Sequence, residues 1–303
     1  MDVKGLFAII RVRSDTMEKI IQGALTANAA SLGLNWIYNI PYLDRLAKEQ
    51  DLTFQAVDPA KYKRARKAYM AYPNAKVGDV SLQGSILKWL VEALKDDNDL
   101  SKEDFEDLLY EKIKPGGPYE GWVESYGKKI ILNHFYKELE LENDPIAIDD
   151  DQLVGFIPYI ACKALNLSNE KAFELAGVFT NDENYLKFYH IFDSLIEKAK
   201  KTSLSEALKA SLTDVPKAFG FKLTMALNTE TPKDILKIVN TSCSIGYALP
   251  LIYTILNSTT SFEEAVRLNT QFGGASSDRG TLIGALLAQL HDINPAWIEL
   301  THL

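Results

Sequence analysis

Cysteine is scarce in this sequence. Among 303 residues only Cys162 and Cys243 occur, far apart and without a Cys-x-x-Cys pair. Small disulfide-stapled domains carry many more cysteines at short spacings. A disulfide scaffold is therefore excluded, and the cysteine usage is typical of a protein from a reducing, cytoplasmic compartment.

Long hydrophobic runs are also lacking. A helix that crosses a bilayer needs about 18 to 20 consecutive apolar residues, and no stretch reaches that length. The short apolar run at residues 5–10 is followed at once by Arg11 and Arg13 and lacks the small-residue cleavage site of a signal peptide. We expect no membrane association and a cytoplasmic location.

Positive charge is in deficit. The 33 Lys and Arg residues face 41 Asp and Glu residues, which gives a net charge of −8. A nucleic-acid interface requires a concentrated basic patch, so we expect no nucleic-acid partner. With 47% hydrophobic and 24% charged residues, the chain is typical of a globular protein, and disordered or collagen-like structure is excluded.

Signals for β-structure are few, whereas signals for helices recur. Strict alternation of apolar and polar residues is scarce, and no hairpin dipeptide stands out. In residues 84–94 the apolar side chains at 86, 87, 90, 91 and 94 share one helical face. Helix starts are indicated by four hydroxyl residues that precede an acidic residue or a proline: Ser101, Ser203, Thr231 and Ser261. The sequence predicts an all-α fold.

Two segments carry no charge at all, residues 20–34 and residues 281–290. A helix that is apolar on every side is buried on every side. We therefore expect these two helices at the centre of the fold. No linker rich in Pro, Gly or Ser divides the chain and no fixed repeat is visible, so a single domain over residues 1–303 is predicted.

The loop before the second uncharged segment, residues 271–280, has an unusual composition. Gly273 and Gly274 allow positive φ angles and expose backbone N–H groups. Ser276 and Ser277 are candidates to cap the following helix, whose N-terminus would suit an anion such as a phosphate. The alternative is a polar helix cap that only closes the loop.

Several short blocks, in matching order along nearly the whole chain, resemble the ADP-ribosylglycohydrolase family in its lens-crystallin-related branch. They are residues 23–38 (GALTANAASLGLNWIY), 78–85 (GDVSLQGS), 119–124 (YEGWVE), 242–250 (SCSIGYALP), the loop at 271–280 and the tail at 294–298 (NPAWI). The resemblance depends on the order of the blocks. It implies a compact orthogonal bundle of many helices, with a cleft between the two buried helices.

The resemblance also implies a chemistry. Family members usually hold two divalent cations, generally Mg²⁺, which orient ADP-ribose and activate water for cleavage of its glycosidic bond. Such hard cations need carboxylate ligands. Here the matching positions are neutral, since the family's acidic or histidine residues are replaced by Asn28, Asn35, Gly84, Ser85, Ala275 and Ser277. We expect no metal ligands, no cofactor and no dinuclear Mg²⁺ site.

Glycosidic bonds can also be cleaved without a metal by two carboxyl groups, one acting as acid and one as base. Asp79, Glu124 and Asp278 are the candidate catalytic residues if the fold brings them together. In the alternative interpretation Asp79 caps a helix, Glu124 lies on a solvated face, and Asp278 pairs with Arg279 or with a helix N-terminus.

The candidate ligand-binding residues come from the same blocks: Asn28, Ser85, Tyr119, Gly121, Gly273, Gly274, Ser276 and Ser277. Four aromatic residues are candidates to stack on an adenine, although ordinary packing explains them equally well: Trp36, Tyr38, Tyr119 and Trp122. The acidic run at 149–151 is expected to cap a helix that begins near Leu153. None of the four histidines is expected to bind a metal.

Three functions follow from these features. The first is an ADP-ribosylglycohydrolase-like protein that lacks the usual Mg²⁺ site, is weak, altered or inactive as a hydrolase, and binds ADP-ribose or a related nucleotide. The second is an active glycohydrolase with a rebuilt site. The third is a non-catalytic structural protein, and no feature of the sequence indicates a partner protein.

Overall fold

The computed structural model describes residues 3–141, 145–148 and 151–303, with side chains from residue 17 onward. Within these residues the fold is all-α, as predicted, and only two isolated β-bridges accompany the helices. In chain order the helices are α1 (Val3–Leu32), α2 (Ile40–Leu46), α3 (Pro59–Ala65), α4 (Leu82–Asp96), α5 (Lys102–Ile113), α6 (Ser125–Glu138), η1 (Leu153–Phe156), α7 (Ile157–Ala164), α8 (Asn169–Ala176), α9 (Asn184–Ala199), α10 (Leu204–Ser211), α11 (Lys217–Leu227), η2 (Pro232–Lys237), α12 (Ile245–Ser258), α13 (Phe262–Phe272), α14 (Ser276–Leu287) and α15 (Pro295–Glu299).

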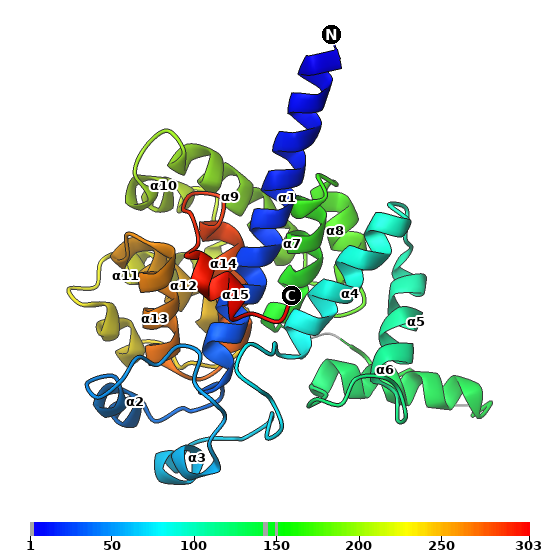
Figure 1. Cartoon of the computed structure of the whole chain (residues 1–303), viewed down its shortest axis with the longest axis horizontal. Helices are drawn as coiled ribbons and strands as arrows, with labels where there is room; N and C mark the ends of the chain where they lie inside the picture. Colours follow the sequence, from blue (N-terminus) through cyan, green and yellow to red (C-terminus); the bar gives the residue numbers. More distant parts are fainter. Residues whose placement is uncertain (1–2, 142–144, 149–150) are drawn as a thin grey trace.

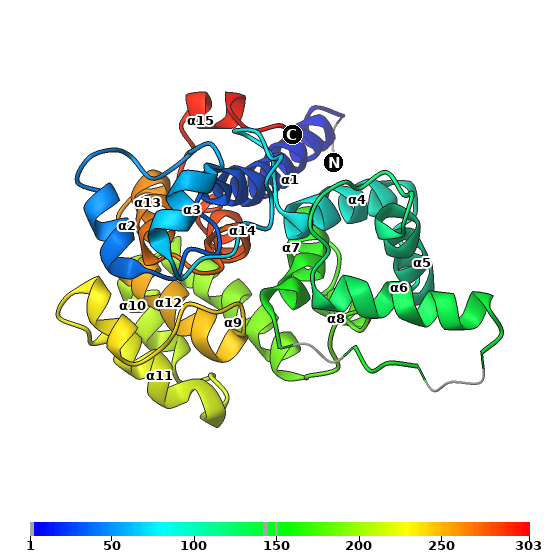
Figure 2. The same ribbon diagram turned by 90° about the horizontal axis from the view of Figure 1, so that it is seen from below.

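Helices α1 and α14 form the centre of the molecule (Figures 1 and 2). From Ile20 onward most of α1 is buried, and every residue of α14 is buried. Both predicted central helices are therefore confirmed. The helices differ from the prediction in length, because α1 already begins at Val3 and α14 begins at Ser276 rather than at Thr281.

Glycines allow the backbones of α1 and α14 to touch. A Cβ atom at Gly284 would lie 2.0 Å from the carbonyl oxygen of Gly23, and one at Gly23 would lie 2.4 Å from the Cβ of Ala288. A Cβ at Gly280 would lie 2.7 Å from the carbonyl oxygen of Ala27. These separations are far below van der Waals contact, so the small residues of both segments set the distance between the two helices.

The other helices flank this central pair. In Figure 2, α4 to α8 lie on one side of it and α10 to α13 on the other. The predicted amphipathic helix is α4, and its apolar stripe, which includes Ile86, Leu90 and Leu94, is buried. The start of α4 contacts both central helices, and this crossing of three helices positions the candidate site.

The predicted helix starts are present. Ser101 and Ser261 each accept a hydrogen bond from the amide three residues further on, and Ser203 forms a full capping box with Glu206. Thr231 precedes the short 3₁₀ helix η2 rather than an α-helix. These hydroxyl residues use local hydrogen bonds that depend little on the rest of the fold, which is why their positions could be read from the sequence.

Asp151, the one residue of the acidic run at 149–151 that the structure describes, does not cap a helix. Asp149 and Asp150 lie outside the described residues. Asp151 accepts a hydrogen bond from the hydroxyl of Ser244, and the residue before η1 is Gln152, whose side chain makes no capping bond. For Asp151, the expected cap is therefore wrong, because the hydroxyl of Ser244 binds this carboxylate.

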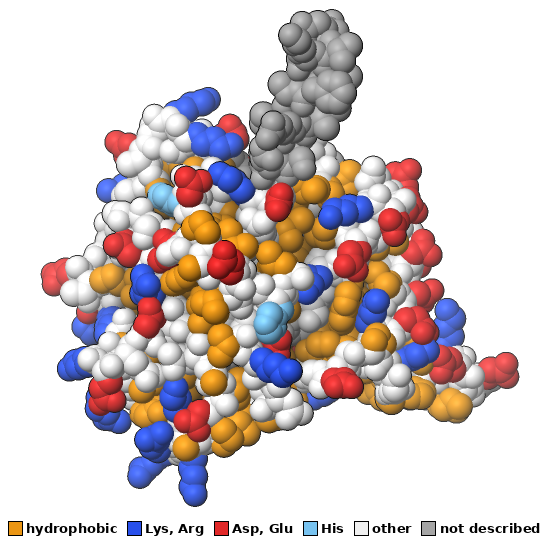
Figure 3. Space-filling view, viewed as in Figure 1, with side chains coloured by type: hydrophobic (Ala, Val, Ile, Leu, Met, Phe, Trp, Pro, Cys, Tyr) orange, Lys and Arg blue, Asp and Glu red, His pale blue; other side chains and the backbone are white. Residues whose placement is uncertain are grey.

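The surface and the helix lengths agree with the composition. No helix in the described part of the chain is long and apolar enough to cross a membrane. On the face drawn in Figure 3, acidic and basic side chains are interspersed among neutral and apolar ones, and no extended field of one sign is visible.

Gly284→Ala is expected to lower the free energy of unfolding by about 1 to 3 kcal/mol, because the added methyl group meets the backbone of α1. Gly220→Ala in α11 is the matched control, since a Cβ there meets no atom within 4 Å. This control should gain up to about 1 kcal/mol through helix propensity. Urea unfolding of both variants measures the difference, and a similar gain in both would contradict the close contact of α1 and α14.

Candidate functional site

Several candidate residues meet where α1, α4 and α14 cross. The Nδ2 of Asn28 donates to the hydroxyls of Ser81 (2.8 Å) and Thr281 (2.9 Å), and its Oδ1 accepts the amide hydrogen of Ser81 (2.8 Å). Ser81 also donates to Oδ1 of Asp278 (3.1 Å), and the Ser277 hydroxyl donates to the carbonyl oxygen of Asn28 (3.0 Å). All five residues are buried. We call these five residues the crossing network.

The N-terminus of α14 is closed by a residue that the sequence did not indicate. The hydroxyls of Ser276 and Ser277 donate to carbonyl oxygens of α1, at Ser31 (3.4 Å) and Asn28, and neither caps α14. The amide of Ser277 instead donates to Oδ1 of Asn35 (3.0 Å), which follows α1. The expected serine cap is therefore wrong, because the contact with α1 takes the serine hydroxyls and Asn35 replaces them.

Gly273 and Gly274 have positive φ angles of 64° and 61°, as predicted. A Cβ at Gly273 would lie 2.4 Å from the carbonyl oxygen of Ile37, and one at Gly274 would lie 1.9 Å from that of Thr241. Their amides donate to the carbonyl oxygens of Thr270 (3.0 Å) and Ile37 (2.8 Å). The loop packs backbone against backbone, and both amides are bound within the protein.

Arg279 supports this loop from the interior. Its Nε donates to Oδ1 of Asn269 (2.7 Å), and its Nη2 donates to the carbonyl oxygens of Asn269 (3.0 Å) and Gly273 (2.9 Å). Burial lowers the pKa of Arg279 to about 10, although the charge of Asp278 acts in the opposite direction. Asp278 lies in the first turn of α14, as one alternative predicted, but its hydrogen bond goes to Ser81 rather than to Arg279.

Glu124 and Asp278 share one buried neighbourhood. Burial raises the pKa of the Tyr72 and Tyr126 hydroxyls and of the Cys243 thiol, and the charges of both Glu124 and Asp278 raise each of these pKa values further. Glu124 precedes α6 and is only 4% exposed. The alternative that places Glu124 on a solvated face is therefore wrong, because Glu124 is buried.

Asp278 is an unusual carboxyl group. Burial raises its pKa from 3.8 to about 7, against the opposing effects of the Ser81 hydrogen bond and the Arg279 charge. Its Oδ2 has no hydrogen-bond partner among the described residues. The group therefore keeps its proton up to nearly neutral pH, in contrast to an ordinary aspartate.

Asp79, unlike the two buried carboxyl groups, lines the cavity beside α4 that is described below, and it has its own hydrogen-bond partners. Its Oδ2 accepts the amide hydrogen of Lys76 (2.7 Å), and its Oδ1 accepts from Nδ1 of His302 (2.8 Å). Partial burial acts to raise the pKa of Asp79, but these two hydrogen bonds outweigh it and lower the pKa below its ordinary value. Asp79 caps a turn and not a helix, because the residue before α4 is Ser81. Of the three candidate catalytic residues, Glu124 and Asp278 are buried and act on the same neighbours, whereas Asp79 is partly exposed.

A cavity of about 720 Å³ opens beside α4, and we call it the α4 cavity. Three candidate ligand-binding residues, Ser85, Tyr119 and Gly121, line it. One wall is aromatic, because the rings of Trp89 and Tyr119 meet edge-on with their centroids 5.7 Å apart, and Trp122 also lines the cavity.

The lining of the α4 cavity also includes residues that the sequence analysis missed: Tyr72, Lys88, Trp89, Lys112 and His302. Lys88 and Trp89 follow Ser85 by three and four positions in α4, so helical spacing alone predicts that they share its face. Lys112 and His302 lie far from Ser85 in the sequence, and no local pattern points to them.

The crossing network does not fit a pair of magnesium ions. Four of its five side chains are neutral, and the hydrogen bonds described above join them to one another. A Cβ at Gly84 would lie 3.2 Å from Oδ1 of Asn28 and 2.6 Å from the Cβ of Val80, so this position faces Asn28 without room for a carboxylate. Nowhere in the described chain do three or more His, Cys, Asp or Glu side chains gather in a way that could hold a metal ion.

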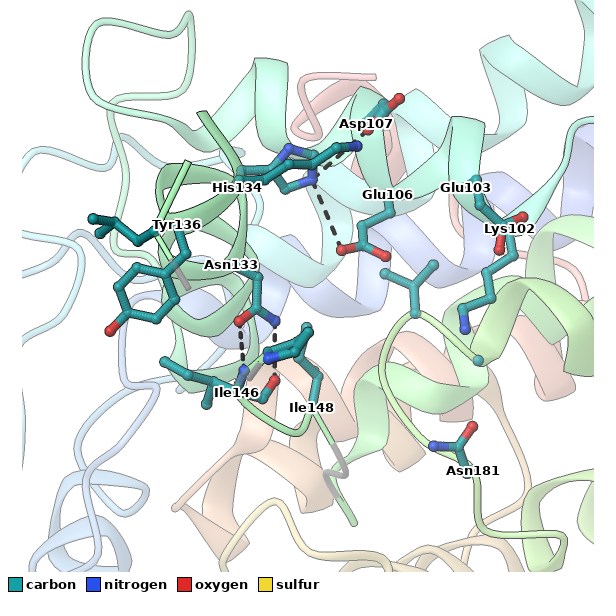
Figure 4. Close-up of a pocket in the computed structure, with 15 residues that line it drawn as sticks. Lys102, Glu103, Glu106, Asp107, Asn133, His134, Tyr136, Ile146, Ile148 and Asn181 are labelled. Carbon is teal, nitrogen blue, oxygen red and sulfur yellow. Dashed lines mark hydrogen bonds and ion pairs between the residues drawn. The ribbon is translucent and has the colours of Figure 1, made fainter. Parts of the chain in front are cut away.

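A second hollow, of about 560 Å³, lies between α5 and α6 (Figure 4). The carboxamide of Asn133 exchanges two hydrogen bonds with the backbone of Ile146 (2.9 and 2.6 Å), and Nε2 of His134 lies 3.8 Å from Glu106 and 3.7 Å from Asp107. None of the candidate catalytic or ligand-binding residues lines this hollow. The candidate site is therefore the α4 cavity, and Glu124 and Asp278 are buried residues that do not line it.

The fold is a set of helices around the closely packed central pair α1 and α14, and its cavity lies at the start of α4. Among solved structures, one described as an "ADP-ribosylglycohydrolase-related protein complex" is similar over 95% of this chain and 94% of that chain, with a TM-score of 0.63 and 16% sequence identity. No family model and no curated protein matches the chain in sequence. The protein thus has an ADP-ribosylglycohydrolase-like fold, as the ordered blocks of its sequence predicted.

Asp278→Asn is expected to stabilise the protein at alkaline pH. The pKa of Asp278 rises from 3.8 to about 7 on folding. The proton on Asp278 therefore contributes fully to the free energy of unfolding below about pH 4, and this contribution is lost progressively up to about pH 7. The variant has no such loss, so its advantage over the wild type should grow by about 2 to 4 kcal/mol between pH 4 and pH 8.

Urea unfolding at several pH values measures this effect. Asp292→Asn is the matched control, because Asp292 is exposed and its pKa is lowered by the Lys19 hydrogen bond rather than raised. It should show no gain at alkaline pH. A pH dependence of Asp278→Asn that parallels the wild type would contradict the raised pKa.

Proposed function

We propose that this protein binds ADP-ribose or a related nucleotide in the α4 cavity and does not hydrolyse it with a pair of magnesium ions. The observation that carries the proposal is the crossing network, in which neutral side chains occupy positions that the resemblance assigns to metal ligands. A neutral oxygen can coordinate Mg²⁺, but it cannot balance the charge of two divalent ions as several carboxylates do. Binding without metal-assisted cleavage is the consequence.

The α4 cavity supports the binding part of the proposal. Its volume of about 720 Å³ lies within the range of about 300 to 1,000 Å³ that is typical of small-molecule sites. Trp89, Tyr119 and Trp122 supply aromatic surface in its wall, and aromatic side chains bind nucleobases by stacking. Trp122 is 42% exposed, so a ligand can reach its ring without a change in the core.

Calorimetry with ADP-ribose, with and without Mg²⁺, tests the proposal. We expect the same affinity in both conditions and no turnover of ADP-ribosyl-arginine or ADP-ribosyl-serine. Trp122→Ala should weaken binding about tenfold, because loss of one stacking partner costs about 1 to 3 kcal/mol. Phe221→Ala is the control, since Phe221 in α11 is 73% exposed and does not line the cavity.

Three results would overturn this proposal. Two stoichiometric divalent ions in the purified protein would contradict the interpretation of the crossing network. Turnover that requires Mg²⁺ would support an active glycohydrolase with a rebuilt site. No binding of ADP-ribose by a correctly folded protein would favour the non-catalytic structural alternative.

A second candidate function is cleavage of a glycosidic bond without a metal, and the specific observation in its favour is the pair Glu124 and Asp278. A protonated carboxyl group can donate its proton to the leaving oxygen while a neighbouring carboxylate activates water. The raised pKa of Asp278, about 7, suits the acid, and Glu124 would serve as the base.

Turnover of ADP-ribosyl substrates in the presence of EDTA tests this second function. If the pair is catalytic, Glu124→Gln should reduce turnover at least about 100-fold, the usual contribution of a general base. Asp292→Asn should leave it unchanged. Turnover that survives Glu124→Gln, or that is absent from the wild type in EDTA, excludes the pair as a catalyst.

A further inference from the structure

The polar end of the α4 cavity is built in part by residues 300–303, which follow α15. The amide of His302 donates to the carbonyl oxygen of Gly78 (2.9 Å), and Nζ of Lys88 donates to the carbonyl oxygen of His302 (3.0 Å). The ring of His302 donates through Nδ1 to Asp79 (2.8 Å). These three hydrogen bonds hold His302 in the wall of the cavity.

Gly78 is required for this arrangement. Its φ angle is 97°, and a Cβ there would lie 2.1 Å from the carbonyl oxygen of Leu300. The same Cβ would lie 3.2 Å from both Nε2 and Cδ2 of His302. The missing side chain therefore lets residues 300–303 pack against the loop and leaves room for the imidazole beside Gly78.

The groups that are free at this end suit an anion. Apart from the two tyrosines, the charged or titratable side chains that line the α4 cavity are Asp79, Lys88, Lys112, Glu120 and His302. Both carboxylate oxygens of Asp79 are bound, one to the amide of Lys76 and one to His302. The groups left to meet a ligand at this end are therefore the Lys88 ammonium and the imidazole. The ammonium is a hydrogen-bond donor, and the imidazole donates through its second nitrogen in its protonated form.

We propose that Lys88 and His302 form a phosphate-binding subsite at the polar end of the α4 cavity. The inference rests on the proposed function and deepens it, because it orients the nucleotide with its phosphates at Lys88 and His302 and its base on the aromatic wall. Asp79 is a positioning residue, because its carboxylate accepts from Nδ1–H of His302. In the imidazolium form of His302, Nε2–H is then the donor that meets the phosphate. Lysine ammonium groups are common phosphate ligands.

Calorimetry with adenosine, ADP and pyrophosphate tests the subsite. We expect ADP to bind more tightly than adenosine, and His302→Gln and Lys88→Ala each to weaken ADP and pyrophosphate about tenfold while adenosine is unaffected. Asp79→Asn should weaken ADP less than His302→Gln does. His190→Gln and Lys95→Ala are the matched controls, because both residues are exposed and lie outside the cavity.

The outcomes separate this inference from the proposed function. Pyrophosphate binding that depends on His302 supports the subsite even if ADP-ribose itself does not bind. Equal affinities for adenosine and ADP, or equal losses for both in His302→Gln, would overturn the subsite while nucleotide binding stands. A Tm unchanged from the wild type in each variant ensures that lost binding does not reflect lost folding.

Discussion

The structure depends on the direct contact between the backbones of α1 and α14. Glycine at positions 23 and 284 brings the helices so close that the carbonyl oxygen of one nearly touches the Cα of the other. At this distance the side chains of Asn28, Ser277 and Thr281 reach each other or the facing backbone directly, with short neutral groups. The short distance between α1 and α14 thus explains both the packing of the helices and the neutral side chains of the crossing network. Several carboxylates in this place would repel one another, and they would need a wider gap or cations between them.

Much of the fold could be predicted because its signals are local. The uncharged segments at 20–34 and 281–290 predicted the central pair, and serine followed by an acidic residue predicted the helix starts. The cap of α14 could not be predicted in this way. Ser277 looks like a cap from its neighbours, but its hydroxyl contacts Asn28 and its amide contacts Asn35, two residues more than 240 positions away.

The site was predictable only in part, for the same reason. Ser85, Tyr119 and Gly121 were found from short blocks, and helical spacing adds Lys88 to them. Glu124 is a charged residue, for which exposure is the ordinary expectation, yet it is buried. Its charge raises the pKa values of Tyr72, Tyr119 and Tyr126, which come from different parts of the chain. His302 joins the cavity through contacts with Gly78 and Asp79, which no pattern near residue 302 reveals.

Tyr72 connects the α4 cavity with the surroundings of Glu124 and Asp278. It lines the α4 cavity, while its hydroxyl accepts the amide hydrogen of Leu82 (3.2 Å) and its pKa is raised by burial and then by Glu124 and Asp278. Glu124 and Asp278 themselves do not line the cavity, whereas Trp122 and His302 do. A ligand at Trp122 and His302 therefore lies against a wall that contains Tyr72 and neither buried carboxyl group. This arrangement supports the proposed binding of a nucleotide over its hydrolysis by Glu124 and Asp278.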